Sequence, residues 1–381
     1  MWCASRNQSG DHVERGMPCA SRVPTMKSVA LICALLGASL QVCGAERLVG
    51  GPFVVHVGPR SATVAWIVET GEATLGTEPG KAEKTAPVLR AEKTSYTGLQ
   101  PGTTYYYDAL GRDEGHGSFK TAPSGPADFQ FVVYGDTRTR HDMHRRVIAA
   151  VMKHGIPDFV MHTGDLVANG ADSSQWPVFF EIERELLRHA AFFPSLGNHE
   201  RNDHQYYDFF DVSTPYYSFD WGQAHFIVLN SDIGNAATSQ AAKLSFWSEQ
   251  VRWLEEDLAT SQKADFRFVM AHHPPMTAVA RRQGDNPEMA ALIPLFEKEH
   301  VTAGFFGHDH NYQHYLKNGV HYVITGGGGA PLYDVDKPPA GITQKVVSTE
   351  HFVSVKVTGK TAHIDALALD GSVLDRIDLK P

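Results

Sequence analysis

The run VMHTGDLVANG, Val160–Gly170, is the part of this sequence around which its other signals group. Its apolar residues end at a glycine that permits a sharp turn, and Asp165 then carries a carboxylate out of the end of a predicted strand. One Gly-Asp pair alone usually marks an ordinary turn. Four comparable pieces, each behind a short apolar run, favour a functional interpretation. These pieces are YGDTR (Tyr134–Arg138), GNHE (Gly197–Glu200), VMAHH (Val269–His273) and GHDH (Gly307–His310).

Predicted strands and helices alternate from Ala127 to the C-terminus, which indicates an α/β layered fold. Helices are expected near residues 143–153, 174–189, 248–260 and 287–300. The last two apolar runs, HFVSVKVT and TAHIDALAL, are polar at alternate positions, as in an antiparallel closing sheet. In open α/β sheets ligands bind beyond the carboxyl ends of the strands, so we expect the five pieces to meet at one site.

The side chains at these five strand ends are oxygen and nitrogen donors suited to hard or borderline metal ions. They are too many for one ion and about right for two. The donors are Asp136, Asp165, Asn198, His272, His308 and His310.

Residues 46–123 contain short alternating segments separated by Gly, Pro and charged turns, with no helical pattern. Trp66 and the run LQPGTTYYY, Leu99–Tyr107, resemble the buried Trp and the Leu-x-Pro-x-Thr-x-Tyr segment of a fibronectin type III domain. We expect Trp66, Tyr105 and Tyr107 to be core and anchor residues of a scaffold. An adhesion or carbohydrate-binding module is the alternative.

With its donor residues assembled, the chain resembles the calcineurin-like metallophosphoesterases, and more narrowly the purple acid phosphatase branch. The resemblance implies a four-layer α-β-β-α sandwich over residues 124–381, preceded by the fibronectin-like domain. It also implies two metal ions, of Fe, Mn or Zn, whose bridging hydroxide attacks phosphorus in line. The implied ligands are Asp136 and His310 for the first metal, Asn198, His272 and His308 for the second, and Asp165 as the bridge.

Four further residues are candidates for the substrate side. His199 resembles the family's histidine that contacts the phosphate and protonates the leaving alkoxide, which a neutral-range pKa permits. His273 adjoins ligand His272 and is either a substrate neighbour or the ligand of that pair. Arg138 suits phosphate oxygens, although a surface ion pair is an equal alternative, and Tyr312 either contacts substrate or covers the site.

The sequence departs from the purple branch at the first metal. Ala168 stands where that branch has a ligand Tyr, which predicts no charge-transfer colour. Arg138 stands where other metallophosphoesterases have a His, so the first metal lacks its usual fourth protein ligand. His144, or else His141, is the candidate to fill that place, with a solvated helix start as the alternative.

The first 45 residues predict a secretory leader. The run MKSVALICALLGASLQVCGAE from Met26 has a lysine, about a dozen mostly apolar residues and then small residues, so Met26 is the expected start and Ala45 the expected cleavage point. A lipid anchor at Cys43 is the alternative. All four cysteines lie in this region, so we expect a mature chain without disulfides or a transmembrane anchor, in a secreted, periplasmic or extracellular location.

Composition and resemblance together predict a phosphoester hydrolase. A net charge of −9 argues against a general nucleic-acid partner. A small phosphomonoester is the expected substrate, and a phosphodiesterase acting on nucleotide or lipid head-group diesters is the alternative. A non-catalytic, metal-stabilised binding or adhesion protein is the alternative of another class. The oligomeric state does not follow from the sequence.

Overall fold

Each of the five predicted site pieces follows a buried β-strand in the computed structural model, which describes residues 46–111 and 113–381. These strands are almost wholly buried, as expected of parallel strands covered on both faces. The predicted leader, with its four cysteines, lies outside the described residues. The five strands are β6 (Phe129–Tyr134), β7 (Phe159–His162), β8 (Ala191–Pro194), β11 (Phe266–Ala271) and β12 (Ala303–Phe306).

The first sheet has the order β18-β17-β16-β6-β7-β8-β1-β2-β3, with β6, β7 and β8 parallel. The predicted antiparallel closing strands are confirmed, because β16 pairs with β6 and β17, and β17 with β18. The remaining strands of this sheet are β1 (Arg47–Val55), β2 (Ser61–Leu75), β3 (Lys84–Thr97), β16 (His351–Thr358), β17 (Thr361–Ala368) and β18 (Val373–Leu379).

The second sheet has the order β15-β13-β14-β12-β11-β10-β9, in which β10, β11, β12 and β14 are parallel. An aromatic-rich core lies between the two sheets, with Phe131 packed edge-on against Phe226 and Phe305. The remaining strands here are β9 (Tyr217–Trp221), β10 (Ala224–Val228), β13 (Tyr312–Lys317), β14 (Val320–Thr325) and β15 (Thr343–Val347).

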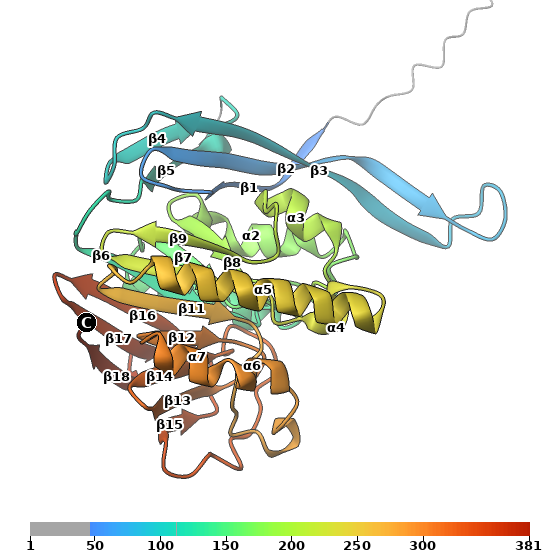
Figure 1. The fold of residues 1–381 in the computed structure, drawn as a ribbon. Helices are drawn as coiled ribbons and strands as arrows, with labels where there is room; N and C mark the ends of the chain where they lie inside the picture. Colours follow the sequence, from blue (N-terminus) through green and yellow to red (C-terminus); the bar gives the residue numbers. More distant parts are fainter. Residues whose placement is uncertain (1–45, 112) are drawn as a thin grey trace, which may run out of the picture. The chain divides into compact units, whose positions relative to one another are not determined.

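Helices cover the outer faces of the two sheets (Figure 1) and complete four α-β-β-α layers, which confirms the predicted fold. The first outer face carries α1 (His141–His154), α2 (Trp176–Leu187) and α3 (His204–Phe210), and the second carries α5 (Gln240–Thr260), α6 (Pro287–Ala291) and α7 (Ile293–Lys298). The short elements are α4 (Ile233–Ala236), η1 (Asp113–Gly115) and η2 (Ala280–Arg282).

Two predicted helices differ from the observed ones. Helix α5 begins earlier than predicted because the Ser239 hydroxyl caps it, accepting a hydrogen bond from the Ala242 N–H. The helix predicted at 287–300 is divided into α6 and α7, where Pro294 occupies the first turn of the second helix and offers no N–H to the preceding turn.

The expected separate fibronectin-like sandwich at residues 46–123 is not shown. Strand β1 pairs in parallel with β8, through Val54 and Ala191, so β1–β3 extend the first sheet, and the described residues form one compact unit. Phe53 of β1 stacks on Phe180 of α2, while Val54 of β1 lies in the same core cluster as Phe119 of β5 (His116–Lys120). Only β4 (Thr104–Asp108) and β5 form a sheet of their own.

The anchoring role predicted for the tyrosines of this region agrees with the structure. The Tyr107 hydroxyl donates a hydrogen bond to the Arg188 carbonyl at 2.9 Å, and Trp66 and Tyr105 pack against the central core. The region is therefore held to the rest of the unit by packing and hydrogen bonds.

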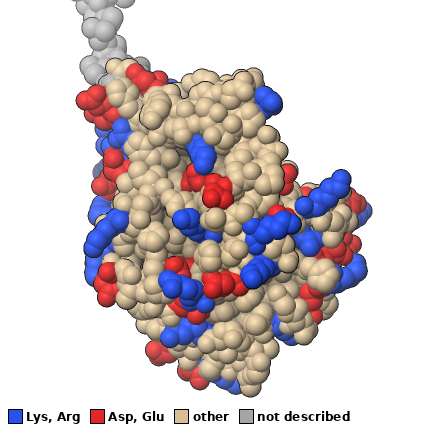
Figure 2. Space-filling model, turned by 90° about the vertical axis from the view of Figure 1, so that its left-hand side faces the viewer, with Lys and Arg blue, Asp and Glu red and all other residues tan. Residues whose placement is uncertain are grey.

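On the face drawn in Figure 2, basic and acidic side chains are intermixed in small groups, with uncharged residues between the groups. This part of the described surface does not form the continuous positive patch that phosphate-backbone binding uses. No helix within 46–111 and 113–381 is long and apolar enough to cross a membrane.

Candidate metal centre

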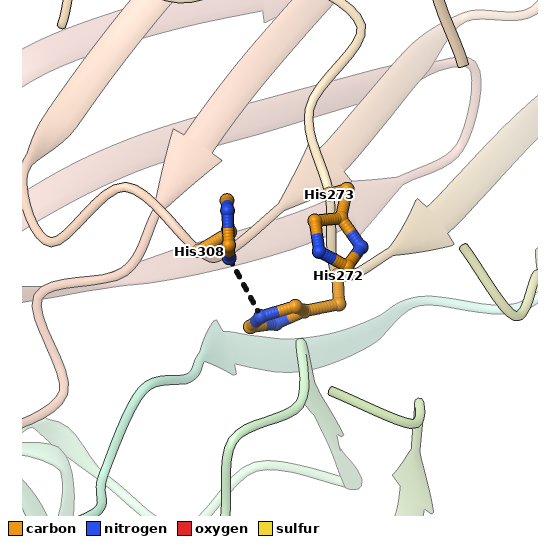
Figure 3. A group of neighbouring side chains, drawn as sticks. All are labelled: His272, His273 and His308. Atoms are coloured by element: carbon orange, nitrogen blue, oxygen red, sulfur yellow. Dashed lines mark hydrogen bonds between the residues drawn. The ribbon is translucent and has the colours of Figure 1, made fainter. Parts of the chain in front are cut away.

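The predicted donor side chains meet at the carboxyl ends of the parallel strands. Ligand atoms of Asp136, Asp165 and His272 all lie within 4.8 Å of one another. The same holds for His272, His273 and His308, which Figure 3 shows on neighbouring chain segments, with His308 directed at His272. The structure thus brings together residues spread over more than 170 positions of the sequence.

The predicted second-metal donors have the spacing of a metal site. His272 Nε2 lies 3.1 Å from Asn198 Oδ1, 3.2 Å from His308 Nδ1 and 3.4 Å from Asp165 Oδ1. Atoms bound about 2.1 Å from one cation lie roughly 3.0–3.4 Å from each other. The three distances from His272 are therefore those expected between ligands of one ion.

Hydrogen bonding explains why a cation belongs there. His272 Nδ1 faces the Thr163 carbonyl at 2.8 Å, and a carbonyl only accepts, so Nδ1 carries the proton and the Nε2 lone pair faces the centre. Burial lowers the pKa of His272, but the charges of Asp165 and Asp136 outweigh it and raise that pKa. The lone pair of His272 and the negative charges of Asp165 and Asp136 are therefore buried together, and a metal ion would accept the lone pair and balance the charge.

The predicted first-metal donors also come together, but with a cationic side chain among them. Asp136 Oδ1 is buried without a hydrogen-bond partner among the described residues and lies 3.4 Å from His310 Nε2. Arg138 donates from Nε to Asp165 Oδ2 at 3.0 Å and from Nη2 to His310 Nε2 at 3.4 Å. Arg138 therefore contacts two predicted ligands directly.

Asp165 is ionised in this setting. Burial raises its pKa, but the charges of His272, His199 and Arg138 outweigh burial and lower the pKa to about 2. Its two carboxylate oxygens face different partners, because Oδ1 accepts the His199 N–H at 3.0 Å and Oδ2 accepts from Arg138. This two-sided position is the one predicted for the bridging residue.

The structure gives His144 and Tyr312 other partners than those predicted. His144 is buried on helix α1, and its Nε2 bonds to Glu183 of α2 at 2.7 Å. Tyr312 is fully buried in the core between the sheets, and its hydroxyl donates to Asp375 at 2.9 Å. These contacts do not support a ligand role for His144 or a substrate role for Tyr312.

His199 has one nitrogen free to face a substrate. Its Nδ1 donates to the Ala168 carbonyl at 2.7 Å, which leaves Nε2 as the nitrogen that can face a substrate. Nε2 lies 3.9 Å from Asp165 Oδ2, and the side chain is 27% exposed. His199 is thus partly exposed beside the predicted bridging residue.

His273 adjoins the second-metal donors and offers a ligand atom within 4.8 Å of those of His272 and His308. Ser231 Oγ holds its Nδ1 at 3.0 Å and also accepts its backbone N–H. Burial and then the charge of His272 lower the pKa of His273 to about 3, which keeps the ring neutral. Its ring centroid is 4.2 Å from that of His308, so His273 packs against a ligand.

The backbone turns that present the ligands are locally strained. Asp136, Asp165 and His308 all have φ between 57° and 68°, in the left-handed region that residues other than glycine rarely adopt. The glycine before Asn198 is required by close packing, since a Cβ on Gly197 would lie 2.3 Å from Asp165 Oδ1. Side chains at these turns are therefore fixed by the surrounding fold.

Glu200 is a site residue that the sequence did not single out. Its two carboxylate oxygens accept backbone N–H groups from the two turns that carry Asp165 and Asn198. Burial and the charge of Asp165 raise the pKa of Glu200 to about 8. In the sequence Glu200 is only the last residue of the GNHE motif. Its neighbours along the chain do not indicate that its carboxylate bonds to the backbone of two loops.

Arg282 and Tyr333 were also missed, because no motif surrounds them. Arg282 contacts His308 Nε2, and its guanidinium carbon lies 5.0 Å from the centroid of the Tyr333 ring. Tyr333 in turn stacks on His310 at 4.1 Å. Arg282 and Tyr333 therefore place a cationic and an aromatic side chain against the predicted ligands His308 and His310.

Comparison with known proteins agrees with this geometry. Residues 129–312 match the model of the calcineurin-like phosphoesterases. The chain is 25% identical over 375 residues to purple acid phosphatase 22 of Arabidopsis thaliana, covering 84% of this chain and 82% of that protein. It is 27% identical over 311 residues to two uncharacterized proteins of Mycobacterium tuberculosis, covering 70% of this chain but only 57% of theirs.

The fold has a counterpart among solved structures. A purple acid phosphatase from yellow lupin seeds superposes with a TM-score of 0.65 at 17% identity, covering 87% of this chain and 74% of the lupin chain. At that identity the likeness concerns the fold. Through residues 129–312 the chain belongs to the calcineurin-like phosphoesterases, whose family implies a two-metal centre, and its similarities make it purple acid phosphatase-like.

Proposed function

We propose that this protein is a metal-dependent phosphomonoesterase. The observation that carries the proposal is the convergence of Asp165, Asn198 and His308 on His272 Nε2, with their nearest donor atoms 3.1–3.4 Å from it. The family match and the similarity to proteins named acid phosphatases support the same reaction class.

The residues around this point have complementary roles in hydrolysis. A bound cation would polarise the phosphoryl group and acidify a water. His199, protonated at Nε2, donates its proton to the leaving oxygen, while the Ala168 carbonyl fixes the ring through Nδ1. Glu200 keeps the Asp165 and Asn198 loops in place through its hydrogen bonds to their backbone.

The two arginines favour a monoester over a diester. Arg138 contacts Asp165 and His310, and Arg282 contacts His308, so two guanidinium groups lie close to the donors. A phosphomonoester carries up to two negative charges near neutral pH, and a diester carries one. Positive charge close to the reacting phosphate therefore favours the dianion.

The test compares an aryl phosphate with its bis-aryl diester, using purified protein reconstituted with Mn²⁺ or Zn²⁺. We expect kcat/KM for the monoester to exceed that for the diester at least about tenfold, and chelation to abolish both activities. Asn198→Ala is expected to lower kcat/KM by about 10²-fold or more. Ser245→Ala, which removes an exposed contact with Glu249 on α5, is the control.

Three results would contradict this proposal. Undiminished turnover by Asn198→Ala would reject the site. Preference for the diester would favour a phosphodiesterase. Metal binding without turnover on either ester would favour a binding protein.

We also propose that the protein is exported through the leader that begins at Met26. The sequence pattern at residues 26–46 supports this proposal. Expression in a bacterium followed by N-terminal sequencing of the exported protein tests it. A mature chain beginning at Glu46 is expected, and an intact leader on cytoplasmic protein would reject export.

A further inference from the structure

Arg138 contacts two of the donors predicted for the metal centre, Asp165 and His310. Its side chain is only 14% exposed and reaches inward from the turn that follows β6. Its backbone N–H donates to the Asp165 carbonyl at 3.3 Å, which fixes the start of the side chain against the bridging residue. From there Nε bonds Asp165 Oδ2 and Nη2 bonds His310 Nε2.

The histidine contact removes a ligand from the first site. His310 Nδ1 donates to the Pro331 carbonyl at 2.6 Å, so the ring has one lone pair, at Nε2. Arg138 Nη2 donates to that lone pair. A lone pair that accepts a hydrogen bond is not available to a metal ion, and the guanidinium remains protonated at all relevant pH values.

No side chain compensates for this loss in the described residues. Ala168 stands where the purple branch has its Tyr, and His144 is bonded to Glu183. The first site therefore offers Asp136 and a shared Asp165 beside a fixed positive charge. Among the second-metal donors, Arg282 contacts His308 only at Nε2, whereas His308 Nδ1, Asn198 Oδ1 and Asp165 Oδ1 lie 3.1–3.4 Å from His272 Nε2, a spacing that suits one ion.

We infer that the guanidinium of Arg138 replaces the first metal ion, so that this protein binds one metal ion, at Asp165, Asn198, His272 and His308. Arg138 then supplies the second positive charge of the centre and balances the Asp165 carboxylate. The inference changes the number of metal ions from the two that the family implies to one. Only the role of the Arg138 charge towards a substrate phosphate rests on the proposed function.

The test counts metal ions and does not depend on turnover. Metal-free protein is titrated with Mn²⁺, bound metal is measured after gel filtration, and electron paramagnetic resonance distinguishes an isolated ion from a spin-coupled pair. We expect one equivalent and an isolated-ion spectrum for the wild type. Arg138→His restores the residue type that other family members have there, and we expect two equivalents and a coupled spectrum.

Arg140 provides a matched control from the same turn. Its guanidinium bonds the carbonyls of Gly329 and Ala330 and the carboxylate of Glu350, none of them a predicted ligand. Arg140→His is therefore expected to bind one equivalent, like the wild type. Arg138→Gln keeps a side chain of intermediate length without charge, and we expect it to take up a second ion more weakly than Arg138→His.

Two equivalents in the wild type would overturn the inference, as would one equivalent in both folded Arg138 variants. These outcomes are separate from the fate of the proposed function. A wild type that binds two ions and hydrolyses phosphomonoesters would reject the inference alone. A wild type that binds one ion and hydrolyses no phosphoester would reject the function alone.

Discussion

The charge on His225 is predicted to make folding stability depend on pH. Its two ring nitrogens lie 2.7 Å from carboxylates of Asp220 and Asp257, which join β10 to β9 and to α5. Burial lowers the pKa of His225, but the hydrogen bonds to both carboxylates and their charges raise it more, to about 9. Helix α5 also holds the loop beside His273, through Gln250 and Asn230.

The expected magnitude follows from this raised pKa. An unfolded His titrates near pH 6.5, so the charged, paired form contributes its full stability below that pH and loses it as pH rises through about 9. A shift from 6.5 to about 9 corresponds to roughly 3 kcal/mol at most. Because Asp220 is 72% exposed, solvent screening reduces this to about 1–2 kcal/mol.

The measurement is urea unfolding of metal-free protein between pH 5.5 and 9.5, followed by circular dichroism. His225→Gln is expected to destabilise the protein by about 1–2 kcal/mol at pH 6, and the difference from wild type should shrink towards pH 9.5. The exposed His204 gives the control variant His204→Gln. A wild-type and His225→Gln difference that stays constant across this pH range would refute the reasoning.

Three other predictions concern the site and its surroundings. His199→Asn removes the proton donor, so kcat should fall by about 10²–10⁴-fold with metal content unchanged; loss of metal instead would show a structural role. Glu200→Ala leaves buried N–H groups near Asp165 unpaired, so urea unfolding should show a free energy of unfolding lower by about 2–5 kcal/mol. Calorimetry should show a weaker metal affinity. A stability and a metal affinity equal to those of the wild type would contradict the positioning role of Glu200. Tyr312→Phe removes the hydrogen bond to Asp375, so the free energy of unfolding should fall by about 1 kcal/mol while kcat/KM stays unchanged. A large change in KM would indicate instead that Tyr312 contacts substrate.

The convergence of the donors could be predicted because it depends on local patterns. Asp136, Asp165 and His272 each follow a continuous apolar run, and such runs form parallel strands whose carboxyl ends share one edge. Once these parallel strands are predicted, the donor residue that follows each strand is placed at the same edge of the sheet. In the structure the donors of the five motifs lie on the turns that follow β6, β7, β8, β11 and β12.

Pairing between distant segments could not be predicted in the same way. Alternating residues at 46–123 indicate strands, but they do not say that β1 pairs with β8 instead of forming a separate sandwich. Helical periodicity placed His144 in α1 without showing that its side chain faces Glu183. Both outcomes depend on which neighbour packs against the element.

The sequence by itself determined the donor types, the strand and turn that carry each of them, and the layered α/β fold, because these follow from composition and periodicity along the chain. Only the tertiary structure decided which atoms meet: Arg138 against His310, Glu200 beneath the ligand loops, and Tyr312 inside the core. The physical reason is that hydrogen bonds and ion pairs between elements depend on ångström distances, which are set by the packing of the whole unit.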